Sequence, residues 1–284
     1  MSEIEPTYVG KNDGLVFVVP KELFKIKLDD IDPELEKEFR GYLRGTFAGL
    51  QTATRTFQGN ENNNKTETSP EFWRDFEKEA RGLGVDLIGY TPVNEDYIFK
   101  GYKIFGKNAI VLGQEMKWEK IKTAPSFECG SEAFRVYKEL GDKVLELTNY
   151  LKKRGYKSEA HHPFGGKMLY PYHAVAAGLG AVGRNGLVVT PEFGPRQRWG
   201  IITTDADISE VSQERLMKME SLCTKCGACL KNCKGGAILE EPIEKVEGSG
   251  IITRIDRSKC IESQVNNTIC SNCLKSCPLG HPKK

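Results

Sequence analysis

Three stretches of the chain have apolar residues at the spacing of a helix. The first runs from about residue 33 to 47. The second begins at Ser69-Pro70, where a capping serine and a proline at the first helical position are typical of a helix start, and it ends near Gly82. The third, from about 131 to 154, is the longest. Each pattern predicts a helix with one face on a core.

Short apolar runs between these helices have the composition of strands. Residues 85–90 (VDLIGY), 108–116 (NAIVLGQEM) and 199–208 (WGIITTDADI) are rich in β-branched and other apolar residues. A similar run at 14–20 (GLVFVVP) predicts a strand near the N-terminus, and the polar segment 59–70 predicts an exposed loop. Helices and buried strands in this order predict a layered α/β or α+β domain.

The composition is that of an ordinary globular protein. The chain has 284 residues, 39% hydrophobic and 28% charged, which is enough for one large core and a small appended module. Its net charge of +2 gives no overall field that would favour a nucleic-acid partner, which we therefore disfavour. No apolar run approaches the roughly 18 residues of a membrane span, and the start, MSEIEPTYVG, shows no export signal. We expect no membrane partner and a cytoplasmic location.

Eight of the nine cysteines fall in two closely spaced groups near the C-terminus. The first reads C-x2-C-x2-C-x3-C, and the second ends in C-x2-C-x3-C-P. Two-residue gaps let three thiolates reach the corners of one iron–sulfur cubane, while the fourth cysteine of each run serves the other cluster. We therefore expect two 4Fe-4S clusters, one on Cys223, Cys226, Cys229 and Cys277 and the other on Cys233, Cys260, Cys270 and Cys273.

Two other uses of these cysteines fit less well. Disulfide frameworks belong to small secreted chains, and structural zinc sites usually show two separated C-x2-C pairs. Lys234 stands where a proline often follows the first run, which is a departure from the ferredoxin pattern. The ninth cysteine, Cys129, lies apart and is predicted to be a small buried apolar residue.

Residues 161–208 are dense in glycine and contain three of the four histidines. A solvated loop with surface histidines is one interpretation. The residues from Gly178 to Gly183 also match the G-x-G-x-x-G fingerprint of dinucleotide sites, and Asp205 could imitate the ribose-binding acid. We reject that interpretation because the fingerprint needs a strand before it and a helix after it. Here an alanine-rich segment precedes the glycines and an apolar run, 187–190, follows them.

The glycines between Gly178 and Gly186 would allow a large planar ligand to approach the backbone without interference from side chains. Arginine and asparagine side chains beside them, including Arg198, supply hydrogen-bond donors, which would suit a cofactor with several carboxamide or phosphate groups. The candidate cofactor-binding residues are Gly178, Gly180, Gly183, Arg184, Asn185, Gly186 and Arg196.

The string AGLGAVGRNGLVVTPEFGPRQR, together with NAIVLGQEM, TTDADI and the double cysteine motif, resembles the catalytic half of the corrinoid-dependent reductive dehalogenases. More distantly it is similar to the epoxyqueuosine reductases. The resemblance covers roughly residues 70–280. It implies a nitroreductase-like α/β sheet domain (69–212) that binds cobalamin, preceded by an N-terminal extension (1–68) that packs on it and followed by a two-cluster ferredoxin-like module (213–284).

The resemblance also implies an activity. Electrons from a ferredoxin- or flavodoxin-type donor would pass through the two clusters to cobalamin, which would reduce a small organic substrate. Tyr137 lies on the long helix at the position of the family's proton donor, Arg184 is placed as its basic partner, and His161 or His162 would lie beside the substrate. A phenol is a weak acid, so such a cation would assist it.

Two alternatives remain open. The chain could be an electron-transfer protein that reduces a separate corrinoid protein. It could also modify a tRNA nucleoside as epoxyqueuosine reductases do, but those enzymes carry an aspartate about fourteen residues before the AGLG glycine, where this chain has Phe164. The sequence leaves open whether the chain forms a homodimer.

Overall fold

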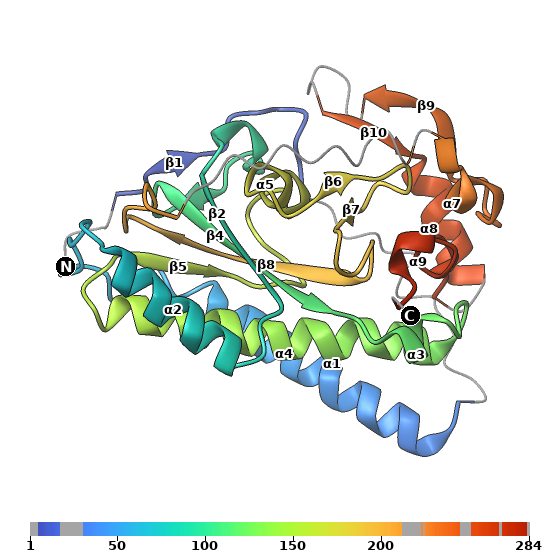
Figure 1. Ribbon diagram of the computed structural model, residues 1–284, viewed down its shortest axis with the longest axis horizontal. Coiled ribbons are helices and arrows are strands. Elements are labelled where there is room, and N and C mark those ends of the chain that lie inside the picture. Colours follow the sequence, from blue (N-terminus) through green and yellow to red (C-terminus); the bar gives the residue numbers. More distant parts are fainter. Residues whose placement is uncertain are drawn as a thin grey trace.

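A four-stranded antiparallel sheet forms the centre of the protein (Figure 1). The computed structural model describes residues 5–17, 31–211, 223, 225–244, 251–266 and 269–282. The strand order is β2-β4-β8-β5. The strands are β2 (Leu87–Pro92), β4 (Asn108–Glu115), β8 (Gln197–Thr204) and β5 (Ser158–His161).

The two central strands are buried on both faces, so they are almost continuously apolar rather than alternating. Strands β4 and β8 pair without interruption from Asn108 opposite Thr204 to Glu115 opposite Gln197. Ile110, which faces the helical layer, and Val111, which faces the opposite layer, are both fully buried. The sheet therefore needs a cover on each side.

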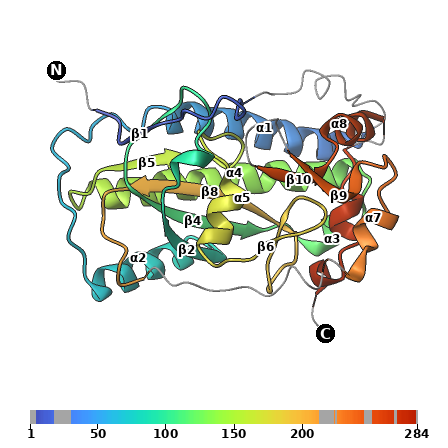
Figure 2. The same ribbon diagram turned by 90° about the horizontal axis from the view of Figure 1, so that it is seen from above.

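Long helices cover one face of the sheet. They are α1 (Pro33–Ala53), α2 (Pro70–Gly82) and α4 (Phe127–Lys152), with the short α3 (Trp118–Ile121). Figure 2 shows α1 running beside α4. Each long helix is preceded by a residue whose side chain accepts a hydrogen bond from a backbone N–H of the first turn. These residues are Asp32 for α1, Ser69 for α2 and Ser126 for α4.

Smaller elements cover the opposite face. Helix α5 (Tyr170–Ala176) leads into a hairpin of β6 (Ala181–Val182) and β7 (Val188–Val189). Beside them lie the η2 turn (Glu95–Tyr97) and the strand pair β1 (Tyr8–Val9) and β3 (Lys103–Ile104).

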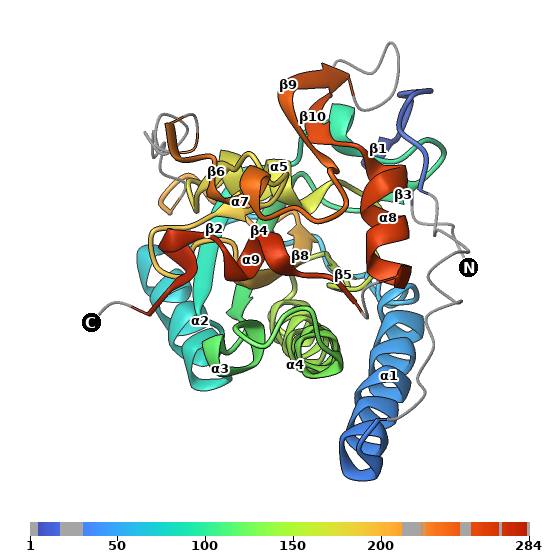
Figure 3. The same cartoon turned by 90° about the vertical axis from the view of Figure 1, so that its right-hand side faces the viewer.

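The C-terminal residues pack against one end of the sheet, as Figure 3 shows. Their elements are α7 (Ala228–Lys231), β9 (Ile238–Glu244), β10 (Ile252–Ile255), α8 (Arg257–Asn266), α9 (Asn272–Lys275) and η3 (Pro278–Gly280). Arg196 joins this module to the sheet: its guanidinium donates to the carbonyls of Gly280 and Met116 and pairs with Glu115 at 2.6 Å. The fold is a mixed α/β fold, as the pattern predicted.

Most of the predicted elements are present. The three helices are confirmed, and the longest begins at Phe127 because Ser126 caps it. Strands are confirmed near 85–90, 108–116 and 199–208. The predicted strand at 14–20 is wrong for residues 14–17, while the rest of it lies outside the described residues.

Three further expectations from the sequence concern the glycine-rich string, Cys129 and the membrane. Helix α5 precedes it and strands follow, so the order of a dinucleotide fingerprint is absent there. Cys129 is buried, as predicted. Among the described residues, none of the helices is long and apolar enough to cross a membrane.

Candidate functional site

The first cysteine group surrounds one small cavity. Its lining includes the thiol residues Cys223, Cys226, Cys229 and Cys277. Burial raises the pKa of the Cys229 thiol, and the neighbouring Cys223 and Cys277 raise it further. Cys277, the last cysteine of the second run, therefore lies with the first group, which is the interleaving that the spacing predicts for a two-cluster protein.

The second cysteine group gathers in the same way. Burial raises the pKa of Cys273 to about 12, and nearby Cys260 and Cys270 contribute next. Cys260 is in turn influenced by Cys270 and Cys233. Cys233, the last cysteine of the first run, thus lies among the second group.

Each cysteine group brings four thiols together. Four thiolates are the ligands of one 4Fe-4S cubane, so the chemistry of the donor set fits two such clusters. Within the described ranges, no three His, Cys, Asp or Glu side chains converge closely enough to hold a single metal ion.

Tyr137 and Arg198 form a pair on the helical face of the sheet. Tyr137 projects from α4 and Arg198 from β8, and the guanidinium carbon of Arg198 lies 5.0 Å from the centre of the Tyr137 ring. Nε of Arg198 is buried without a hydrogen-bond partner, and Arg198 has no ion pair within the residues that the structure describes. A buried donor without an acceptor is rare in proteins and needs an explanation.

Aromatic rings surround this pair. The ring of Tyr137 lies 5.7 Å from that of Phe134 and 5.2 Å from that of Phe164, and Phe164 contacts Phe47 of α1 at 5.4 Å. Phe164 is the residue at which the epoxyqueuosine reductase pattern would place an aspartate. The half-buried ring of Tyr137 thus packs against two aromatic rings and the Arg198 guanidinium.

The second cysteine group adjoins the start of the same helix. The pKa of Cys129, in the first turn of α4, is raised mainly by burial, and both Arg198 and Cys270 influence it. A side chain at Gly130 would collide with Ile269, since its Cβ would lie 2.4 Å from the Ile269 side chain. The segment that carries Cys270 thus packs on the end of α4 that leads to Tyr137.

Arg184, the expected basic partner of Tyr137, lies at the first cysteine group. Arg184 and Asn185 line the cavity of the first cysteine group. Arg198 instead occupies the place beside Tyr137. The sequence could not show which of the two arginines lies beside Tyr137. Both belong to the same glycine-rich string, and the path of the β6–β7 hairpin decides where each one lies.

The glycine string packs mainly against protein. A Cβ at Gly180 would lie 2.4 Å from the Val189 carbonyl, one at Gly183 2.6 Å from the Val189 side chain, and one at Gly186 2.6 Å from Ile255. Gly178 has a positive φ of 70°, which suits the end of α5. These glycines are required by the hairpin and its contact with β10. The guanidinium of Arg196 is already used in its contacts with Gly280, Met116 and Glu115.

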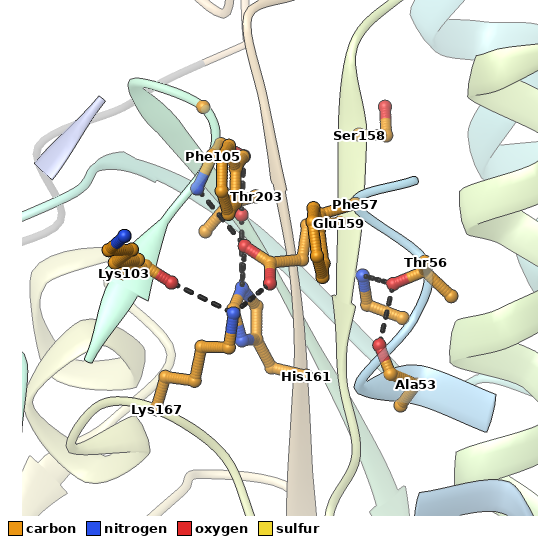
Figure 4. A network of polar contacts seen from close by, with 12 residues as sticks. Ala53, Thr56, Phe57, Lys103, Phe105, Ser158, Glu159, His161, Lys167 and Thr203 are labelled. Atoms are coloured by element: carbon orange, nitrogen blue, oxygen red, sulfur yellow. Dashed lines mark hydrogen bonds and ion pairs between the residues drawn. The ribbon is translucent and has the colours of Figure 1, made fainter. Parts of the chain in front are cut away.

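The two adjacent histidines lie on opposite faces of the sheet, because successive residues of a strand alternate. His161 lies in a buried network with Glu159, Lys167 and Thr203 (Figure 4). His161 Nε2 is 3.0 Å from the Thr203 hydroxyl, which donates to the Phe105 carbonyl at 2.9 Å. Burial holds the pKa of His161 well below its usual range.

His162 fills the contact between two helices. Its Nδ1 accepts from the Phe164 N–H at 3.1 Å, and its Nε2 is buried without a partner. A Cβ at Gly141 of α4 would lie 2.1 Å from that Nε2, and one at Gly49 of α1 3.0 Å. Burial lowers the pKa of His162 to about 4. Neither His161 nor His162 is among the ring contacts of Tyr137 in the described structure.

A larger open cavity of about 600 Å³ lies elsewhere, between α5, η2 and the end of β2. Tyr97, Tyr172 and His173 are part of its lining. It shares no lining residue with the cysteine groups or with the Tyr137 pair.

The known proteins found similar to this chain in sequence are tetrachloroethene reductive dehalogenases. No family model matches the chain. The tetrachloroethene reductive dehalogenase of Desulfitobacterium hafniense is 29% identical over 216 residues, which cover 72% of this chain and 38% of the relative. That of Sulfurospirillum multivorans is 29% identical over 184 residues, covering 61% and 35%.

Solved structures show the same fold. A reductive dehalogenase whose structure suggests a mechanism for B12-dependent dehalogenation superposes with a TM-score of 0.74 at 20% identity, over 99% of this chain and 44% of that one. The epoxyqueuosine reductase of Bacillus subtilis superposes less closely, with a TM-score of 0.53 at 18% identity over 75% of this chain and 66% of that one.

The chain spans less than half the length of the dehalogenases that it matches. All of these relatives are oxidoreductases by name, and the epoxyqueuosine reductases are the more distant in structure. The resemblance to the superfamily of reductive dehalogenases and epoxyqueuosine reductases, closer to the dehalogenases, is confirmed.

Proposed function

We propose that this chain is the catalytic core of a corrinoid-dependent reductase of the reductive dehalogenase type. The observation that carries the proposal is the arrangement at one end of the sheet: thiols in two interleaved groups, the second of which adjoins the helix that bears Tyr137 and its partner Arg198. An electron path would then end beside a proton donor, as a reductase requires.

The two cysteine groups would hold two 4Fe-4S clusters. The clusters would pass electrons one at a time from a ferredoxin- or flavodoxin-type donor. Cys226 is the exposed member of the eight cysteines, whereas Cys270 adjoins Cys129 at the start of α4. We therefore place electron entry at the first cluster and delivery at the second.

A residue of β8, rather than the glycine-rich string, offers a group that fits a corrinoid. Nε of Arg198 is buried without a partner on the α4 face of the sheet, beside Tyr137. A corrinoid carries several carboxamides, whose C=O groups would accept a hydrogen bond from such a donor. When bound, it would supply a strongly reducing cobalt centre for breaking the substrate bond.

The side chains around Tyr137 would perform the proton chemistry. The phenol Oη of Tyr137 would donate a proton to the reduced organic product, and the guanidinium of Arg198 over the ring would stabilise the phenolate that remains. The rings of Phe134 and Phe164 would exclude water from this step and hold an apolar substrate. We propose small halogenated organic compounds as the substrate class.

The same surroundings disfavour the two alternatives. An epoxyqueuosine reductase would need its aspartate where Phe164 contacts Tyr137. An electron carrier without a substrate would have no use for an unpaired arginine over a phenol.

Metal analysis and turnover of the anaerobically purified chain test the proposal. We expect about eight iron atoms per chain from the two-cubane assignment, uptake of cobalamin, and release of halide from a halogenated substrate. Cys226→Ala should lose about half of the iron while the matched Cys129→Ala variant keeps it. A chain that holds eight irons but never binds cobalamin would favour the electron-transfer alternative, and one that holds no iron would refute the cluster assignment.

A further inference from the structure

The tip of the β6–β7 hairpin is a fixed turn packed on the C-terminal module. The N–H of Gly183 donates to the Leu187 carbonyl at 2.7 Å, and the N–H of Leu187 donates to Oδ1 of Asn185 at 3.2 Å. Gly186 has a φ of 72°, and its Cα lies so near Ile255 of β10 that no side chain would fit. The sequence thus builds a rigid projection from the sheet domain towards the cysteines.

Two residues of this tip line the first cysteine cavity. Arg184 and Asn185 line it together with all four thiol residues of the first group. Asn185 is buried and its side-chain oxygen is used within the turn. Arg184 is thus a positively charged residue in the lining of the cavity, and the turn fixes its backbone.

We propose that Arg184 sets the reduction potential of the cluster held by the first cysteine group, a proposal that rests on the proposed function. A guanidinium is never deprotonated in a protein, so its charge is permanent. One-electron reduction adds a negative charge to a cluster that four thiolates already surround. A fixed cation beside it stabilises the reduced state more than the oxidised state, which raises the potential.

The position of Arg184 in the fold supports this role. The first group contains the exposed Cys226, so an external donor meets this cluster first. A raised potential there makes the arrival of the electron more favourable. Arg184 is a positioning residue for electron entry, whereas Arg198 acts at the phenol.

Anaerobic redox titration of the full chain, followed by electron paramagnetic resonance of the reduced clusters, tests the proposal. Cys226→Ala, which removes the first cluster, identifies the titration step that belongs to it. In Arg184→Gln we expect the equilibrium constant for reducing the first cluster to fall about tenfold, which is a shift of about 59 mV for one electron. The second step should stay in place, and Arg184→Lys should keep most of the wild-type potential.

Arg74→Gln is the matched control, because it removes the same charge from an exposed site on α2, at the other end of the molecule (Figure 1). Unchanged reduction potentials in Arg184→Gln with full iron content would overturn the proposal, while the assignment of the two clusters would still hold. Loss of the first cluster from both Arg184→Gln and Arg184→Met would also overturn it, in favour of a structural role. Absence of iron from the wild-type chain would instead overturn the proposed function.

Discussion

Two groups of buried polar side chains, one on each face of the central sheet, differ in whether their polar atoms have partners. On the α5 face, Glu159 pairs with Lys167, accepts from the Phe105 N–H at 3.0 Å, and lies beside His161, whose Nε2 reaches Thr203. On the α4 face, Nε of Arg198 and Nε2 of His162 are buried and have no partner. Both faces belong to the same strands.

The difference separates polar groups that hold the fold together from those available to a ligand. A buried network whose members satisfy one another stabilises one arrangement and offers nothing to a substrate. An orphaned donor costs free energy unless something else accepts from it. His162 is enclosed by the glycines of two helices, whereas Arg198 lies beside Tyr137, where we propose that the reaction occurs.

The largest effect should come from breaking the satisfied network. Lys167→Met leaves the carboxylate of Glu159 buried without its cation, so we expect the free energy of unfolding to fall by about 3 kcal/mol. Denaturant unfolding measures it, with Lys103→Met as the exposed control. The double variant with Glu159→Gln should recover part of the loss. A Lys167→Met chain as stable as wild type would show that the network is not structural.

His162 should make the fold sensitive to acid. Its pKa is about 4 in the folded chain against an ordinary value of 6.5. Between these pH values the unfolded chain binds a proton on this ring that the folded chain does not, so acidification lowers the free energy of unfolding. The contribution is present above pH 6.5 and falls by up to about 3 kcal/mol as the pH approaches 4.

The variant His162→Asn keeps an acceptor for the Phe164 N–H and removes the titration. It should be less stable at neutral pH but show a flatter dependence of the urea midpoint on pH between 6.5 and 4. Equal slopes for the variant and the wild type would mean that the ring is not buried in its neutral form.

Arg198→Met should have the smallest effect of the three on stability, because it leaves no buried charge behind. The methylene chain keeps much of the packing on Tyr137, while the cation is lost. We expect halide release to fall about tenfold or more, the effect of removing one charged stabiliser of the phenolate. Turnover that depends on Arg184 but not on Arg198 would reverse the assignment of the two arginines.

The fold was largely predictable from sequence because capping residues and short apolar runs show where its helices and strands lie. Ser69 and Ser126 cap their helices, and apolar runs such as 108–116 give the central strands. The grouping of the thiols was also predictable, since gaps of two and three residues limit which ones can meet.

The partner of Tyr137 was not predictable. Arg184 and Arg198 are separated by a hairpin whose path depends on contacts with Val189 and Ile255, which lie outside the short motif. The different surroundings of His161 and His162 were not predictable for a related reason. Adjacent residues suggest one site in a sequence, but the alternation of a strand sends His161 and His162 to different layers.

Halide release by Tyr137→Phe is the most direct test of the account, because it removes one hydroxyl from the proposed reactive position and keeps the ring. We predict unchanged iron content and unchanged cobalamin uptake in the anaerobic protein. Turnover should fall about a hundredfold or more, the usual effect of losing a positioned acid. A variant that binds both cofactors and turns over at the wild-type rate would contradict the central claim that the Tyr137 and Arg198 pair is where the reaction occurs.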